Sequence, residues 1–381
     1  MDNFSIIELK NFQINKLEIF YQFSFNQKKI LFNTKKRLKK ILKKFNDFRF
    51  LQVLKSHEFF KKFFSKINYF SFSGNQLQSW FYFWFINAAD IIGIKIETSI
   101  KKKIKETLKF ILLRKGYLNK NFFSSETLLS LYSALLSFSC FEKLEFKNQR
   151  AFQITIYSFL RKIKKKKVYR CSAYGESDSR SFFCVLVISS FFNILTKNLW
   201  KDIILLFYNK CSLDGGYGCD KLEESHGALT YCEIASFTFF SNRDDSSVLH
   251  PNFENWVLKK LKPFEFGIQG RPTKLPDTCY LFWVGGISII CSFLFPLECF
   301  NVLIFNRERK TDGFSDQIGK IPDLYHSCYS ICGLALCNFV WKKKVCFFKN
   351  KKKRNSLFKI NPVYGIREKK VGAILKLCDD L

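Results

Sequence analysis

Apolar residues recur at helical spacing along most of the chain, and a short pattern of two small residues followed by an apolar one returns at a nearly constant interval. The four clearest copies, 46, 50 and 47 residues apart, are centred on Ser190, Ser236, Gly286 and Gly333. A Gly-rich turn precedes three of these copies, and small residues let one helix approach another closely. A repeat of about 50 residues with one turn and two helices is typical of an array of helical hairpins. The pattern therefore predicts an all-α protein, built either as an open solenoid or as a closed ring.

The first part of the chain differs from this repeat because Lys and Phe dominate it. Between Leu38 and Phe45, apolar residues lie at helical spacing among basic side chains, which predicts an amphipathic basic helix with a solvated charged face. We therefore expect two parts: a basic, Phe/Lys-rich helical segment at residues 1–70 and the helical repeat domain at residues 71–381.

The charge of the chain is unusual in its sign rather than in its amount. Lys and Arg number 63 and Asp and Glu number 32, so the net charge is +31. The 47 Phe residues accompany this excess of Lys, and both are typical of a bias toward AT-rich codons. Short Lys runs fall between the apolar helices, where we expect exposed loops or helix ends. Such loops can bind a phosphate backbone without specificity, but no aromatic side chains interleave regularly with them as a base-stacking platform requires. We therefore expect no nucleic-acid partner.

The cysteine pattern bears on the compartment. The chain has 14 Cys, which are scattered and form no C-x-x-C pair, and the residues after Met1 lack the basic and apolar regions of a secretory leader. Reduced thiols in the cytoplasm are the simplest interpretation.

One apolar run is long enough to raise the question of a membrane anchor. Residues 278–297 carry no charged side chain, and about 20 apolar residues can span a bilayer. However, Gly, Ser and Pro residues interrupt the run, Asp277 and Glu298 flank it without a basic neighbour, and the run belongs to the repeat. A buried helix is therefore favoured over a transmembrane anchor.

Reactive side chains concentrate where the turns lead into the inner helix of each repeat. Asp277 and Cys279 occupy one such start and His326 the next, and equivalent positions of a closed array converge on one mouth. Oxygen, sulfur and nitrogen ligands together suit zinc, and three protein ligands leave a fourth position open, as catalytic zinc sites do. The alternative is that a His and a Cys 47 residues apart in a Cys-rich chain are unrelated.

The same helix starts are basic. His226, Arg271 and Lys274 accompany predicted helix N-termini, and such termini favour bound anions, so this end of the array suits a phosphate or diphosphate. In a chain of this charge, solvated loop cations are the alternative interpretation.

Three stretches of the sequence closely resemble the β subunits of protein prenyltransferases, in the order and at the spacing of that family. They are Asp214 to Gly227, Gly270 to Gly286 and Asp323 to Leu334. A fainter resemblance runs from Trp80 to the C-terminus. The resemblance implies an α–α toroid, which is a closed ring of helical hairpins.

The resemblance also implies the chemistry of the site. Asp277, Cys279 and His326 would hold one zinc ion, and the fourth ligand would be the Cys thiol of a substrate protein that ends in a CaaX motif. A metal-bound thiol is deprotonated, so it would attack C1 of an isoprenoid diphosphate as a thiolate.

Further residues fall on positions that the family uses for its substrates. The positions at the diphosphate, where charge grows on the leaving group, are His226, Arg271, Lys274 and Tyr280. The positions along the isoprenoid are Trp80, Phe183, Cys232, Trp283 and Tyr329. The positions at the CaaX peptide are Arg180, Trp84 and Tyr325.

Several positions bear on the length of the isoprenoid. Tyr329 and the bulky Trp80 resemble farnesyltransferases. Asp316 matches the carboxylate with which those enzymes recruit magnesium to the diphosphate, where geranylgeranyltransferases have Lys. Against this, Asp277-Thr278-Cys279 and the residues after Trp283 resemble the geranylgeranyl enzyme. We expect a farnesyltransferase that uses farnesyl diphosphate and magnesium, with geranylgeranyltransferase type I as the alternative.

Some positions depart from the family, and other protein classes fit the sequence less well. Ala228 and Leu229 replace a Gly and a Tyr of the isoprenoid wall, which bears on donor affinity. The Rab-type prenyltransferase fits the turn before His326 less well, and the lack of an Asp-x-Asp-Asp motif argues against a terpene cyclase. A non-catalytic basic scaffold would not need the reactive set. The family's β subunit acts with a helical α subunit, so we expect a heterodimer and an inactive isolated chain.

Overall fold

The computed structural model describes much of the chain after residue 58. The described residues are 59–60, 78–114, 128–141, 149–172, 175–200, 210–219, 223–240, 250–262, 267–292, 313–317, 320–344 and 357–372. All of them lie in the compact unit Asn46–Leu381. The basic helix predicted in residues 1–70 lies outside the described residues, which include only Phe59 and Phe60 of that segment.

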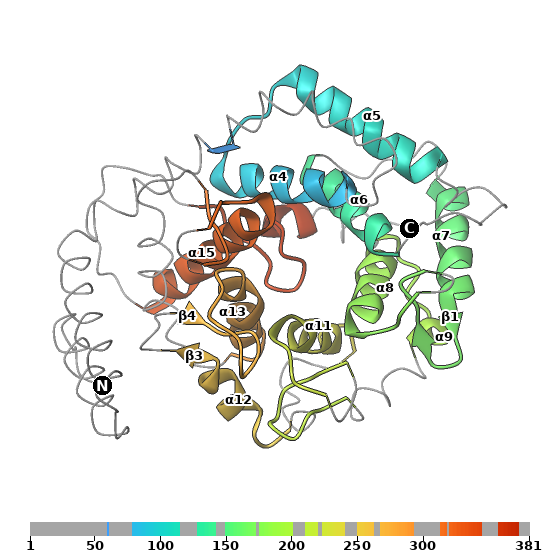
Figure 1. Ribbon diagram of the computed structural model, residues 1–381. Coiled ribbons are helices and arrows are strands. Elements are labelled where there is room, and N and C mark those ends of the chain that lie inside the picture. The colour runs from blue at the N-terminus through green and yellow to red at the C-terminus, as the bar shows by residue number, and fades with distance from the viewer. Residues whose placement is uncertain are drawn as a thin grey trace, which may run out of the picture. The chain divides into compact units, whose positions relative to one another are not determined.

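Six of the described helices form an inner ring. In chain order they are α4 (Gln78–Ile92), α6 (Leu128–Phe141), α8 (Ser179–Phe191), α11 (Gly227–Phe237), α13 (Tyr280–Ile290) and α15 (Leu324–Lys344). Each contacts the next, and α15 contacts α4, so the ring is closed (Figure 1). These helices are apolar on nearly all sides because they are packed on both flanks.

The other described helices lie outside the ring. They are α5 (Thr98–Arg114), α7 (Gln149–Ile163), α9 (Lys197–Trp200) and α12 (Phe253–Lys259) (Figure 1). Two short antiparallel hairpins connect elements: β1 (Lys164–Lys165) pairs with β2 (Val168–Tyr169), and β3 (Leu261–Lys262) pairs with β4 (Gly267–Ile268). In their registers, Lys165 lies opposite Val168 and Leu261 opposite Ile268. Inner and outer helices arranged in this way confirm the α–α toroid and decide for the closed ring over the open solenoid.

The small residues of the repeat lie where inner helices touch. A Cβ atom on Gly333 of α15 would come within 2.6 Å of Leu281 Cγ on α13, and one on Gly286 of α13 within 2.9 Å of the Tyr231 ring on α11. Atoms of a close-packed interior do not approach so closely. The recurring small pair is therefore the sequence signature of neighbouring inner helices in contact.

The C-terminal segment, residues 357–372, joins opposite sides of the ring. The hydroxyl of Tyr231 on α11 donates to the carbonyl of Pro362 at 2.7 Å. The amide of Asn87 on α4 donates to the carbonyl of Gly365 at 2.9 Å. Both donors are buried, so these bonds satisfy polar groups that would otherwise destabilise the inner ring.

The apolar run at residues 278–297 contains a short helix. Within it, α13 spans eleven residues and packs against α11 and α15, which agrees with the predicted buried helix. Residues 293–297 lie outside the described part of the chain. Among the described residues, no helix has the length and apolar character needed to cross a membrane.

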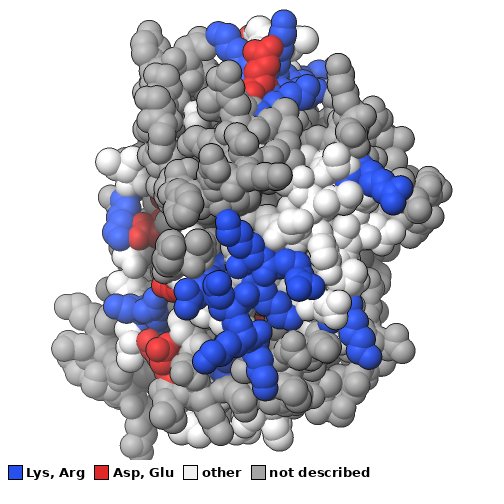
Figure 2. Space-filling view, turned by 90° about the vertical axis from the view of Figure 1, so that its right-hand side faces the viewer, with Lys and Arg blue, Asp and Glu red and all other residues white. Residues whose placement is uncertain are grey.

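Charge is unevenly spread over the described surface. Lys and Arg side chains gather where α7, the β1–β2 hairpin and α9 meet (Figure 2). The Lys164–Lys167 run, predicted as an exposed loop or helix end, forms β1 and the tight turn that follows it. Lys165, Lys166 and Lys167 are exposed, as predicted for this run.

Gly365 offers a test of the contact between the C-terminal segment and the ring. Its φ is +68°, and a Cβ atom would lie 3.0 Å from the Phe282 ring. We expect Gly365→Ala to lower the free energy of unfolding, measured with urea, by about 1–3 kcal/mol. The control is Gly372→Ala, because nothing lies within 4 Å of that Cβ position. Equal effects of the two substitutions would contradict the role given to Gly365.

Candidate functional site

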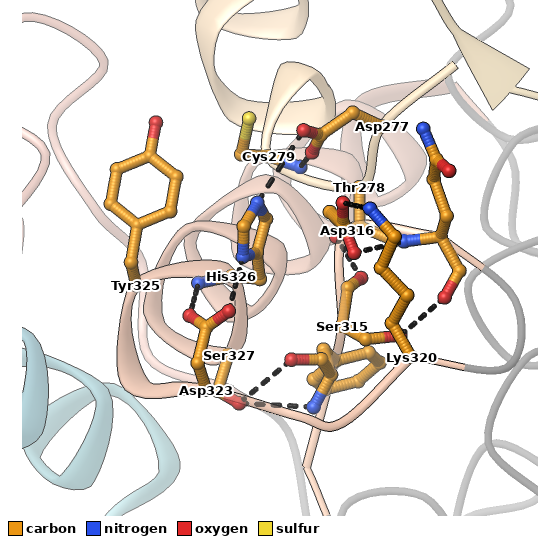
Figure 3. Close-up of polar contacts among 12 residues, drawn as sticks. Asp277, Thr278, Cys279, Ser315, Asp316, Lys320, Asp323, Tyr325, His326 and Ser327 are labelled. Carbon is orange, nitrogen blue, oxygen red and sulfur yellow. Dashed lines mark hydrogen bonds and ion pairs between the residues drawn. The ribbon is translucent and has the colours of Figure 1, made fainter. Parts of the chain in front are cut away.

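Three potential metal ligands meet at the N-terminal ends of two inner helices. Asp277 lies in the turn before α13, Cys279 caps that helix, and His326 is in the first turn of α15. Their ligand atoms all lie within 4.8 Å of one another (Figure 3). The sequence placed these residues at equivalent helix starts, and the closed ring brings them together.

Hydrogen bonds fix the orientation of each member of this group. The Cys279 N–H donates to Asp277 Oδ1 at 2.8 Å, and His326 Nε2 lies 3.4 Å from Asp277 Oδ2. On the other side of the imidazole, Nδ1 lies 2.6 Å from Asp323 Oδ2 (Figure 3). A carboxylate behind a His in this way holds the ring with its second nitrogen toward a metal.

The pKa values of His326 and Cys279 favour the protonated forms of both side chains. Burial lowers the pKa of His326, but hydrogen bonds with Asp277 and Asp323 outweigh it and raise that pKa to about 9. Burial, and then the charge of Asp277, raise the pKa of the Cys279 thiol well above its usual value. A divalent cation reverses both tendencies, since it binds thiolate and neutral imidazole and releases their protons. The donor set therefore fits a metal such as zinc.

A second cluster surrounds the start of α11. His226 caps this helix: its Nδ1 accepts the Ala228 N–H at 3.0 Å. Its Nε2 lies 3.3 Å from the hydroxyl of Tyr280, the first residue of α13. Because Nδ1 accepts, the neutral ring carries its proton on Nε2 and can donate it. Burial, and then the charge of Arg271, lower the pKa of His226 to about 4.

Arg271 and Lys274 lie in the exposed turn that leads from β4 to α13. The Gln269 side chain fixes this turn from inside, because its amide donates to the carbonyl of Lys274 at 2.7 Å and also to that of Pro272. The charge of Arg271 acts on both His226 and Tyr280, and Lys274 adds a second cation to the same turn.

Aromatic side chains from all six inner helices form a closed series of ring contacts, which we call the aromatic belt. Successive ring centroids lie between 4.4 and 6.0 Å apart. In order, the members are Trp80, Tyr132, Phe183, Tyr231, Trp283, Tyr329, Tyr325 and Trp84, which returns to Trp80. Cys232 lies buried on α11 next to belt residue Tyr231. Trp80, Trp84 and Trp283 are only partly buried, so the belt presents an aromatic wall to an apolar ligand.

The belt reaches the metal-ligand group. Trp283 Nε1 donates to the Tyr325 hydroxyl at 3.2 Å, and Tyr325 precedes His326 with their rings 4.8 Å apart. An apolar ligand on the belt would therefore lie beside the Asp277, Cys279 and His326 group.

Two of the predicted site residues already have partners. Arg180, in the first turn of α8, pairs with Glu176 at 3.1 Å and with the buried Asp178. Asp316 accepts the Lys320 ammonium at 2.6 Å and the Gln317 N–H at 2.8 Å. The Asp316 carbonyl also accepts the Thr278 N–H at 3.3 Å, which places Asp316 beside the metal-ligand turn.

Sequence reasoning missed three residues of the site. Tyr132 and Tyr231 complete the belt, but nothing in a chain with 47 Phe and 15 Tyr distinguishes them. Asp323 orients His326, and its position three residues before that His at a predicted helix start was an available signal.

Comparison with known proteins agrees with the closed ring of helices. The family model described as "Prenyltransferase alpha-alpha toroid domain" matches residues 51–366. The protein farnesyltransferase subunit β of Schizosaccharomyces pombe is 24% identical over 278 residues, which cover 68% of this chain and 71% of that protein. The geranylgeranyl transferase type-1 subunit β of Arabidopsis thaliana is 34% identical over 176 residues, covering 42% and 46%. The match thus spans less than half of the Arabidopsis protein.

A solved structure has a similar fold. The Candida albicans protein geranylgeranyltransferase-I complexed with GGPP superposes with a TM-score of 0.67, covering 84% of this chain and 97% of that one. At 18% sequence identity, this likeness shows the toroid alone.

The low pKa of His226 predicts a pH-dependent stability. The ordinary His pKa of about 6.5 applies to the unfolded chain, which therefore binds this proton more tightly than the folded chain. Stability is thus lost as pH falls from about 6.5 toward about 4. We expect His226→Asn, which keeps an acceptor for the Ala228 N–H, to lose about 2 kcal/mol less stability than the wild type between about pH 7 and pH 5 in urea unfolding.

The matched control for this prediction is His250→Asn. His250 Nδ1 accepts the Asn252 N–H at 3.1 Å, so its local bonding is similar. If both variants lost less stability than the wild type by the same amount, His226 would not be the group responsible for the pH dependence.

Proposed function

Because the chain belongs to the prenyltransferase α–α toroid family, we propose that it is the catalytic β subunit of a zinc-dependent protein farnesyltransferase. It would transfer farnesyl from farnesyl diphosphate to the Cys of a C-terminal CaaX motif. The observation that carries this proposal is that the metal-ligand group of Asp277, Cys279 and His326 lies next to the aromatic belt at Tyr325. A sulfur nucleophile and an apolar donor would meet there.

Asp277, Cys279 and His326 would hold the zinc ion. Zinc, when bound, supplies a substrate thiolate at neutral pH. Asp323 would act as a positioning residue, because its bond to Nδ1 keeps His326 Nε2 directed at the metal. The nearby Tyr325 and Trp283 rings would exclude water from the thiolate.

The cluster at α11 would bind the diphosphate. His226 and Tyr280 offer neutral donors, and Arg271 and Lys274 offer positive charge. As the C1–oxygen bond breaks, negative charge grows on the diphosphate, and donors already in place stabilise that charge. Asp316 would recruit magnesium to the same group, with Lys320 as its partner in the absence of the ion.

The belt supports the farnesyl donor over the longer geranylgeranyl donor. Trp80 packs against Trp84 at 5.8 Å and Tyr132 at 5.9 Å, and its indole would occupy the space that a fourth isoprene unit needs. Arg180, Trp84 and Tyr325 would receive the CaaX peptide. The catalytic partner would be a helical prenyltransferase α subunit.

Protein geranylgeranyltransferase type I is the second candidate function. It is favoured by the Asp277-Thr278-Cys279 turn and by the 34% identity to the Arabidopsis geranylgeranyl transferase type-1 subunit β. It keeps the same fold, metal ligands and thiolate chemistry, so only the donor separates the two candidates.

The first experiment tests the metal. The chain would be co-expressed with a prenyltransferase α subunit, and transfer to a fluorescent CaaX peptide and zinc content would be measured. We expect Cys279→Ala to lose zinc and to lower the transfer rate by more than about 100-fold. Cys219→Ala changes an exposed thiol outside the site and should retain both. Full activity of Cys279→Ala would refute the proposed metal role.

The second experiment tests the donor. We expect the wild type to prefer farnesyl diphosphate, and Trp80→Ala to raise the ratio of kcat/KM for geranylgeranyl over farnesyl diphosphate by about 10–100-fold. Trp200→Ala removes an indole on α9, outside the belt, and should leave the ratio unchanged. A wild type that prefers geranylgeranyl diphosphate, with no change in Trp80→Ala, would favour the second candidate function.

A further inference from the structure

One sector of the toroid has few acidic side chains to balance its Lys and Arg residues. Residues 149–200 contain ten Lys and Arg but only two acidic residues, Glu176 and Asp178, whereas the ratio in the whole chain is 63 to 32. Both acidic side chains pair with Arg180. The share of Lys and Arg here, ten in 52 residues, is close to that of the whole chain, so the high net charge of this sector comes from its few acidic side chains.

Most of these cations belong to one surface, which we call the basic face. Its members are Arg161, Lys162, Lys164, Lys165, Lys166, Lys167, Arg170 and Lys197. The β1–β2 hairpin follows α7 directly in the chain. Lys164 Nζ donates to the Asn198 carbonyl at 2.7 Å, which links the hairpin to α9. Figure 2 shows Lys and Arg gathered on this side of the molecule.

The conformation of the basic face is locally unfavourable for its Lys residues. Four consecutive Lys residues repel one another at a tight turn, and Lys166 takes a φ of +52°, a region that favours Gly. Lys165, Lys166, Lys167 and Lys197 make no ion pair with any residue that the structure describes. Their charges are therefore available to an external anion.

The surroundings of the face favour a lipid surface over a nucleic acid. Among the described residues, this face has no row of exposed aromatic rings for successive bases: Tyr169 is buried, and Tyr157 and Trp200 are partly buried. Instead the exposed stripe of α7 that ends in Arg161 also carries Ile154, which is 59% exposed. Basic and apolar side chains on one helix face are typical of contact with a bilayer.

We propose that the basic face docks the enzyme on membranes that contain anionic phospholipids. Clusters of Lys and Arg bind such surfaces without needing a defined partner geometry. The hairpin packs on the first turn of α8 through the stacked rings of Tyr169 and Phe182, so the face lies at the end of the ring where Arg180 and the other site residues lie. If the proposed function holds, both the isoprenoid donor and the prenylated product are lipids, and docking would place the site near their reservoir.

The test measures binding of the heterodimer to vesicles by sedimentation. Vesicles of phosphatidylcholine alone are compared with vesicles that contain about 30 mol% phosphatidylserine, at about 0.1 M and about 0.5 M NaCl. We expect binding only to the anionic vesicles and only at the lower salt. Reversal of three charges, Lys165→Glu with Lys166→Glu and Lys167→Glu, should weaken that binding by about 100-fold.

A matched variant separates the basic face from net charge. Lys102→Glu with Lys103→Glu and Lys109→Glu reverses three exposed charges on α5 and should change binding by less than about threefold. Prenyl transfer to a soluble peptide should be unchanged in both triple variants, so that failure of docking is distinguished from failure of the proposed function. Equal losses in the two variants, or no preference for anionic vesicles, would overturn the proposal. Tighter binding to double-stranded RNA or to polyglutamate at the same salt would also overturn it, and would assign the face to a nucleic acid or an acidic protein.

Discussion

Closure of the ring between α15 and α4 is the contact on which the rest of the molecule depends. It brings Trp84 of the first described inner helix against Tyr325 of the last, and without it the aromatic belt would be open. Buried Asn87 reinforces the contact because it reaches from α4 to the Gly365 carbonyl and lies 3.5 Å from Cys332 Sγ on α15. If the contact between α4 and α15 were entirely apolar, the two helices could shift along each other more easily. A buried polar group restricts such shifts, because its hydrogen bonds are satisfied in few positions.

The site uses the ends of the inner helices, where backbone and side-chain polarity is unavoidable. Each inner helix is largely apolar along its length, and the reactive side chains of the site stand at the helix starts, where backbone groups need polar partners. The His226 side chain caps α11, Cys279 occupies the N-cap position of α13, and Asp323 bonds the first turn of α15. The same residues that complete the helices therefore carry the chemistry, while the belt between them stays apolar.

The sequence was informative where a residue type has few uses and uninformative where it has many. Gly286 and Gly333 recur because only small residues allow the observed helix contacts, so the repeat, and with it the toroid, could be predicted. Asp277, Cys279 and His326 stand at equivalent turns, so their convergence followed once a ring was assumed. Tyr132 and Tyr231 gave no such signal, since their role depends on which of many aromatic residues face one another across helices. The basic face was also hidden, because a Lys run in a Lys-rich chain predicts only exposure, and the hairpin that gathers it with α9 is a tertiary feature.

The long reach of the C-terminal segment constrains how the chain folds as it is made. The bond between Asn87 and Gly365 joins residues 278 positions apart, and at about 5–20 residues per second the second partner emerges roughly 14–56 s after the first. For most of that interval α4 has neither the last inner helix nor the C-terminal segment to cover its apolar sides. Contacts of such sequence separation form late and slowly. Nascent chains of this protein would therefore expose apolar surface of an incomplete ring while they are still bound to the ribosome. Truncation before the C-terminal segment would leave that surface permanently exposed.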